Sequence, residues 1–150
     1  MNPFDPKAAL LAKHAQHVVL VHFPIALFLT GTAFDFAARW IRSQRTALAA
    51  AAYLNLMAAA VFAVPTVATG IAAWQWLLEG KKLKGVLLLH AGLACASAVL
   101  IWGVAWIHFR RRQTPDSTPG YCLALEFLTA IVIALTGHLG GFLSGVNVPG

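Results

Sequence analysis

The sequence predicts an all-α integral membrane protein in which four helices cross the bilayer as an up-down-up-down bundle. Of its 150 residues, 59% are hydrophobic and only 11% are charged, whereas an average soluble domain is about 45–50% apolar and about 25% charged. A soluble domain of this size keeps much of its surface in water and has no place for such an apolar excess. The excess therefore has to face lipid.

Four runs with few or no charges are long enough to form spans, because a helix needs about 20 apolar residues to cross the hydrocarbon core. The predicted spans cover residues of about 16–38, 48–74, 85–108 and 121–143, and we expect them to form one membrane domain over residues 1–150. The links between the runs are short. Short links place successive helices antiparallel and side by side, which predicts the bundle topology.

Two prolines fall inside the predicted spans. A helix that started at Pro24 would have only fifteen residues before Arg39, which is too short to cross the membrane. We therefore expect the first helix to begin well before His22 and to be kinked near Pro24, and we expect Pro65 to act in the same way in the second span. Such prolines are tolerated when neighbouring groups satisfy the carbonyl that has lost its partner.

The formal net charge of +6 comes from lysines and arginines clustered between the apolar runs. This pattern is typical of membrane loops and not of a continuous basic patch, so we do not expect nucleic-acid binding. One end of the bundle, named here the arginine end, carries Arg39, Arg42, Arg45, Arg110, Arg111 and Arg112. The other, named the terminal end, has both chain termini and carries Lys7, Lys13, Lys81, Lys82 and Lys84. Six positive residues against five favour the arginine end inside and both termini outside.

Four of the six histidines fall at the terminal end. His22 is early in the first span, His90 is early in the third, and His138 is late in the fourth. At about 1.5 Å per residue, all three lie roughly 6–8 Å below the membrane surface, and His17 lies one to two turns closer to it. Polar groups in the hydrocarbon region are costly and usually mark function, the alternative being an interhelical hydrogen bond.

Imidazoles at matched depth indicate metal or haem binding, because neutral imidazole is the commonest metal ligand in proteins. Two of them on facing helices can hold a haem iron, and bundle cores are a usual site for such cofactors. Three of them around one point, as with His22, His90 and His138, would suit zinc or copper instead. No Asp or Glu lies in the terminal half of any span, which argues against a carboxylate-bridged di-iron site there.

The arginine end has its own polar residues. Asp35 ends the first span and Glu126 begins the fourth, so the two carboxylates are expected to be near neighbours. Arg39 lies one helical turn beyond Asp35, and we predict an interfacial ion pair between them in preference to a proton-uptake path. His108 also lies at this end. Cys95 and Cys122 are expected to be unpaired and to serve apolar packing.

Three segments resemble a bacterial family of small membrane proteins called domain of unknown function 2231. They are the opening segment His17-Val18-Val19-Leu20-Val21-His22-Phe23-Pro24-Ile25-Ala26-Leu27, the lone His90, and the segment Thr136-Gly137-His138-Leu139-Gly140-Gly141. Together they extend over nearly the whole chain. The resemblance implies a multi-pass protein of the bacterial inner membrane. Since some members of the family are joined to Rieske-type iron–sulfur domains, it also implies electron transfer near quinone or cytochromes.

The leading hypothesis is a membrane b-type haem protein, or a subunit of one, that passes electrons between a quinone pool and a redox partner on the terminal side. His22 and His90 are the expected axial ligands, since the first and third helices of a bundle face each other diagonally. His138 is the main substitute for either, and His17 is a candidate neighbour of a haem propionate or a ligand at a second site. The expected partners are the lipid bilayer and other redox subunits of the membrane or periplasm.

Two alternatives stand beside it. One is a membrane protein that binds zinc or copper through His22, His90 and His138 without haem. The other is a structural or assembly subunit of a larger complex, in which the histidines only bond helices together. A transporter is less favoured because the chain lacks visible inverted repeats and has few charges at midplane. The sequence shows no Cys-x-x-Cys-His segment, so covalent haem attachment is not expected.

Overall fold

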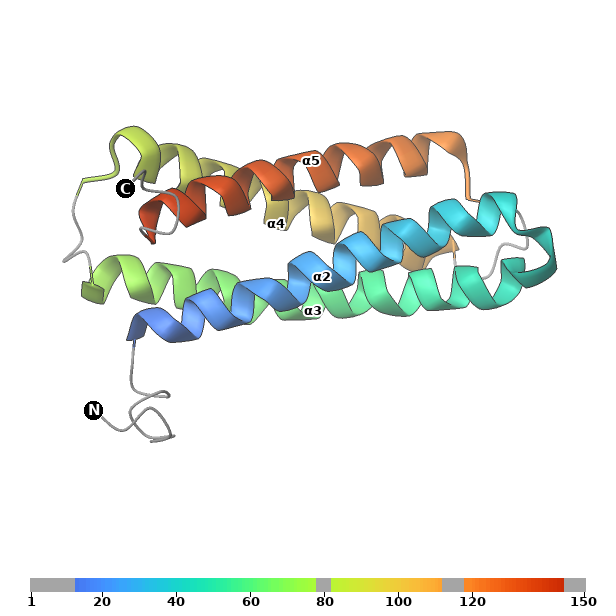
Figure 1. Ribbon diagram of the computed structural model, residues 1–150, viewed down its shortest axis with the longest axis horizontal. Coiled ribbons are helices and arrows are strands. Elements are labelled where there is room, and N and C mark those ends of the chain that lie inside the picture. The colour runs from blue at the N-terminus through green and yellow to red at the C-terminus, as the bar shows by residue number, and fades with distance from the viewer. Residues whose placement is uncertain (1–12, 78–81, 112–117, 145–150) are drawn as a thin grey trace.

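The computed structural model describes residues 13–77, 82–111 and 118–144. Within these ranges the chain forms four long helices and one short 3₁₀ turn (Figure 1). The elements are α2 (Lys13–Trp40), η1 (Arg42–Gln44), α3 (Arg45–Leu77), α4 (Gly85–Arg111) and α5 (Gly120–Leu143). The charged residues Lys7, Lys81 and Arg112, which entered the predicted orientation, lie outside the described residues.

The four helices pack antiparallel, which confirms the predicted all-α bundle. Figure 1 shows α2 and α3 as one pair and α4 and α5 as the other, with the two pairs lying against each other along the bundle. Each helix packs on the next in sequence, and α2 closes the ring against α5. As a result α2 and α4 occupy diagonal corners, as the short links predicted.

All four helices are long and apolar enough to cross a membrane. The candidate spans are Gln16–Trp40, Arg42–Gln75, Gly85–Arg111 and Gly120–Leu143, with a mean hydropathy between 1.7 and 2.0. Large apolar side chains such as Leu54, Val61 and Val99 are about two-thirds exposed on the outside of the bundle. Such a surface is stable in lipid and would aggregate in water, so the protein is a multi-pass membrane protein.

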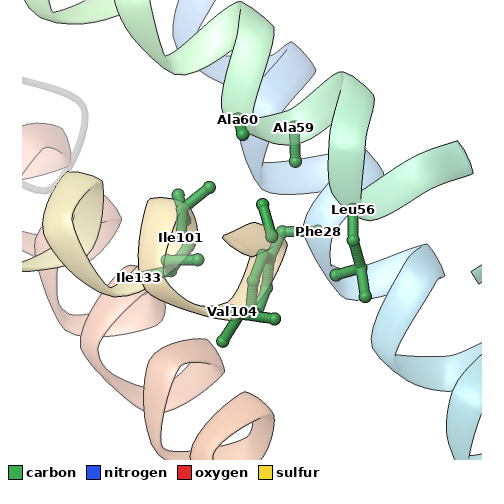
Figure 2. Close-up of a cluster of buried hydrophobic side chains, with 8 residues drawn as sticks. Phe28, Leu56, Ala59, Ala60, Ile101, Val104 and Ile133 are labelled. Carbon is green, nitrogen blue, oxygen red and sulfur yellow. The ribbon is translucent and has the colours of Figure 1, made fainter. Parts of the chain in front are cut away.

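The apolar core lies where all four helices meet (Figure 2). Small residues of α3 let the other helices approach closely, which is the usual way for membrane helices to gain packing contacts. The buried cluster consists of Phe28, Leu56, Ala59, Ala60, Ile101, Val104, Ala105 and Ile133. It lies in the middle of the bundle and toward the arginine end, and this rigid part of the fold supports the polar residues described below.

Both helices with internal prolines continue through them, and α2 begins well before His22 as predicted. Pro24 has no N–H to offer to the carbonyl of Leu20, four residues earlier. The Thr66 hydroxyl of α3 lies 3.3 Å from that carbonyl and 2.8 Å from the Phe62 carbonyl of its own helix, so its single proton is shared between the two. A neighbouring helix therefore offers a donor to the backbone group that the proline released.

We expect Thr66→Val to destabilise the protein by about 0.6 kcal/mol and by no more than about 1.7, the range measured for hydrogen bonds between membrane helices. The cost should shrink in a Pro24→Ala background, because the restored N–H of residue 24 then serves the Leu20 carbonyl. A double-mutant cycle on unfolding in mixed micelles measures this coupling. Equal costs in both backgrounds would mean that the hydroxyl does not act on this carbonyl.

Candidate metal centre

Three ionisable side chains from three different helices converge at the arginine end. Asp35 of α2, His108 of α4 and Glu126 of α5 each offer a ligand atom, and these atoms lie within 4.8 Å of one another. Counting along each helix at about 1.5 Å per residue, the group lies roughly 5–9 Å inside the ends of the spans. Ionisable residues at such depth are functional candidates by default.

The contacts within the group are short. His108 Nε2 lies 2.8 Å from Glu126 Oε1 and 3.7 Å from Asp35 Oδ2, so one ring nitrogen faces both carboxyl groups. The Thr118 hydroxyl, which lies just before α5, donates a hydrogen bond of 2.7 Å to Asp35 Oδ1. Arg39 in turn donates to the Thr118 carbonyl at 3.3 Å. Thr118 therefore links Asp35 to Arg39 through its hydroxyl and its carbonyl.

The two carboxyl groups are buried, and each keeps one oxygen unsatisfied. Glu126 has no exposed surface and Asp35 is 3% exposed. Asp35 Oδ2 and Glu126 Oε2 have no hydrogen-bond partner among the described residues. Buried carboxylates are costly unless they are paired or bind a metal, and an unsatisfied buried oxygen is a sign of a ligand or an ordered water.

The core residues hold these side chains in place through helical periodicity. Phe28 lies two turns before Asp35 on the same face of α2, and Val104 lies one turn before His108 on α4. On α5, Glu126 and Ile133 are also two turns apart and are both buried. The faces that build the apolar core thus carry the three ligands at its edge, so the ligands are positioned by packed helices and not by loops.

The chemistry of this donor set suits a divalent transition metal. One imidazole nitrogen and two carboxylate oxygens favour zinc, iron(II) or manganese over metals that prefer thiolates. Two ionised carboxylates also balance the charge of a divalent ion. The unsatisfied oxygens Asp35 Oδ2 and Glu126 Oε2 already belong to the group, so the residues present fit such an ion.

The sequence had predicted part of this arrangement. The expectation that Asp35 and Glu126 are near neighbours is confirmed. The predicted ion pair between Asp35 and Arg39 is wrong, because Arg39 bonds to the Thr118 carbonyl and Asp35 faces Thr118 and His108 instead. His108 was placed at the correct end but was not predicted as a ligand. Its place within two helical turns of the same end of the bundle as both carboxylates was the signal that could have found it.

The four histidines predicted as cofactor ligands lie in the terminal half, and three of them contact backbone carbonyls. His90 Nδ1 lies 3.1 Å from the Thr136 carbonyl of α5, and His22 Nδ1 lies 2.7 Å from the Val18 carbonyl of its own helix. His17 Nδ1 lies 3.1 Å from the Thr66 carbonyl of α3. Since a carbonyl only accepts, Nδ1 carries the proton in all three contacts, and Nε2 is the nitrogen with a lone pair.

Two glycines let these rings lie close to neighbouring helices. A Cβ at position 70 would be 3.0 Å from the ring of His17, and one at position 140 would be 3.2 Å from the ring of His90. His138 is exposed and its ring meets Phe142 edge-on at 5.0 Å. Among the described residues, the group at the arginine end is the only one in which three ligand side chains converge. Ligation by His22, His90 and His138 stays a prediction.

A family model described as a predicted membrane protein, DUF2231, matches residues 13–147 of the chain. No curated protein and no solved structure matches this chain.

Proposed function

This chain belongs to the DUF2231 family of predicted membrane proteins, and we propose that it binds a divalent transition metal within the membrane through Asp35, His108 and Glu126. The observation that carries the proposal is the convergence of three ligand atoms within 4.8 Å, with two buried carboxylate oxygens that lack partners. Asp35, His108 and Glu126 would hold such a metal through one ligand atom each, and they would do so in their deprotonated forms.

Three protein ligands leave at least one coordination position open to water or a substrate. Structural zinc sites use four protein ligands, whereas catalytic zinc sites use three and keep the fourth position open. The proposed site therefore belongs to the class in which the metal acts on a bound molecule.

Cobalt(II) is the direct probe, because its visible spectrum reports coordination number and geometry. We expect the purified protein in detergent to take up one cobalt ion with the bands of a low-coordinate site. His108→Gln at the arginine end should abolish this spectrum, whereas His90→Gln at the terminal end should leave it intact. The opposite pattern, in which His90→Gln removes the bands, would overturn the assignment and favour the terminal histidines as the metal site.

We expect Thr118→Val to weaken cobalt binding by about 10–100-fold, the usual cost of losing a hydrogen bond to a metal ligand. Valine keeps the size of threonine but cannot donate to Asp35 Oδ1. The matched control is Thr30→Val on the exposed face of α2, which makes the same chemical change far from the ligands. Cobalt titration of both variants measures the difference, and an equal affinity for the two would refute this role of Thr118.

A second function rests on the terminal histidines. We propose that His22 and His90 serve as axial ligands of a b-type haem, with His138 as the substitute for either and His17 near a propionate. The protonated Nδ1 of His22 and His90, each bonded to a backbone carbonyl, supports this proposal. Metal-bound histidines usually donate the other ring N–H in this way and ligate through Nε2. The haem, when bound, would supply one-electron redox chemistry.

A dithionite-reduced minus air-oxidised spectrum, with a pyridine haemochrome assay, tests the second function. Sharp α and Soret bands that are lost in His90→Gln would support it. A flat spectrum from protein made in haem-replete cells would remove it. If cobalt uptake fails as well, a structural or assembly subunit becomes the better explanation, and His90→Gln should then leave the activity of the parent complex unchanged.

Orientation and partners follow from the same proposals. We propose a bacterial inner-membrane protein with the arginine end inside and both termini periplasmic, because positive residues favour the inner side. If the haem is present, a quinone pool and periplasmic or membrane redox subunits are the expected partners. C-terminal reporter fusions that are active only in the periplasm would test the orientation, and a cytoplasmic C-terminus would reverse it.

A further inference from the structure

The turn between α2 and α3 forms a basic recess at the arginine end, which shares no residue with the ligands of the proposed metal centre. It has a volume of about 660 Å³ and is lined by Arg39, Trp40, Arg42 and Arg45. These residues come from the end of α2, from η1 and from the start of α3, so three consecutive elements each contribute an arginine to the lining of one space. None of its described lining residues is acidic, and the ion pairs among described residues involve only His108.

The recess lies at the membrane–water boundary. The first candidate span ends at Trp40 and the second begins at Arg42, so the recess is at the level where lipid headgroups lie. Trp40 is 72% exposed, and its ring lies 6.2 Å from that of Phe36 one turn deeper in the membrane. An apolar strip therefore runs from the recess down the lipid-facing side of α2.

We propose that this recess binds the phosphate of an anionic phospholipid. The planar guanidinium matches phosphate oxygens with two parallel hydrogen bonds, and three such groups around one space can hold a single phosphate. The exposed Phe36 and Trp40 offer a surface for the acyl chain of the same molecule, which a free phosphate could not use. Charge complementarity and position at the headgroup level thus favour a lipid over a soluble anion.

Native mass spectrometry of the intact protein, released from micelles that contain phosphatidylglycerol or phosphatidylcholine, tests the proposal. We expect the wild type to retain phosphatidylglycerol in preference to phosphatidylcholine. Arg42→Gln with Arg45→Gln should weaken retention about 25-fold, from roughly fivefold for each arginine. Arg39 is left unchanged because it also bonds to Thr118.

The matched control is Arg110→Gln with Arg111→Gln, which removes the same charge from the same end but outside the recess. Arg110 lies over the Trp106 ring at 5.1 Å, away from the described lining residues. This control should retain phosphatidylglycerol as the wild type does. Equal losses in both double variants would mean general attraction to basic loops and would overturn the proposal. Displacement of the lipid by equimolar inorganic phosphate would also overturn it, since the recess would then be a site for the free anion.

Discussion

Replacing Glu126 with glutamine should weaken cobalt binding by at least about 100-fold, a loss greater than that for a residue that only orients a ligand. Glutamine has the same shape and keeps an oxygen that can accept from His108 Nε2, now 2.8 Å from Glu126. It lacks the negative charge that a divalent ion requires. Cobalt titration of the purified variant, followed by its visible bands, measures the loss.

The same substitution should leave the metal-free protein as stable as the wild type, or more so. Glu126 has no exposed surface and one of its oxygens lacks a partner, so its ionised form is costly in the absence of a cation. Thermal unfolding of metal-free protein in detergent measures this. If Glu126 served the structure, its replacement would lower the stability of the protein. If it serves metal binding, its replacement lowers only the affinity for cobalt. A variant that loses stability while keeping its affinity for cobalt would contradict the proposed site.

The fold was predictable because hydropathy and link length act on whole segments. The span predicted over residues of about 85–108 corresponds to α4, because Lys84 and Arg110 mark where the chain enters and leaves the hydrocarbon. The other three spans agree similarly well with their helices. The sequence predicted that a neighbouring group would bond to the Leu20 carbonyl, but it did not identify that group. That some neighbour would bond to it follows from Pro24, but that Thr66 does so depends on the register of α2 and α3.

The site was harder to predict, because depth along a helix says which residues share a level and not which faces meet. Asp35, His108 and Glu126 share a level and also a common face toward the core, so they converge. The local rule that pairs residues one turn apart favoured Arg39 for Asp35. The chain between α4 and α5 instead brings Thr118 to both residues, a contact that joins positions far apart in sequence.

The terminal histidines illustrate the same limit. His90 was predicted to face a common cofactor with His22 and His138 because of their matched depth, and His17 was predicted to lie nearer the surface, beside a haem propionate. In the structure His17 lies against α3 and His90 lies against α5, each at a glycine that admits its ring. The helix that each ring contacts depends on the direction in which Gly70 and Gly140 face around their helix axes. Counting residues along a helix gives the depth of a side chain but not this direction.

Replacing Gly31 with valine should destabilise the protein by about 1–3 kcal/mol, the usual cost of overpacking a core. Gly31 is buried between α2 and α3, where an added Cβ would lie 2.9 Å from Leu56 Cγ and 3.2 Å from Asn55 Cβ. Leu56 is itself fully buried and has little room to move. Asp35 lies one turn further along α2, so a shift of this helix should also lower cobalt affinity.

Gly92→Val is the matched control, because Gly92 is exposed and a Cβ there meets nothing within 4 Å. It should unfold at nearly the wild-type temperature. A second change tests the cause directly: Leu56→Ala makes room beside position 31, so the two substitutions together should cost less than the sum of their separate costs. If the costs instead add, Leu56 is not what the valine meets, and the close approach of α2 to α3 does not depend on the missing side chain of Gly31.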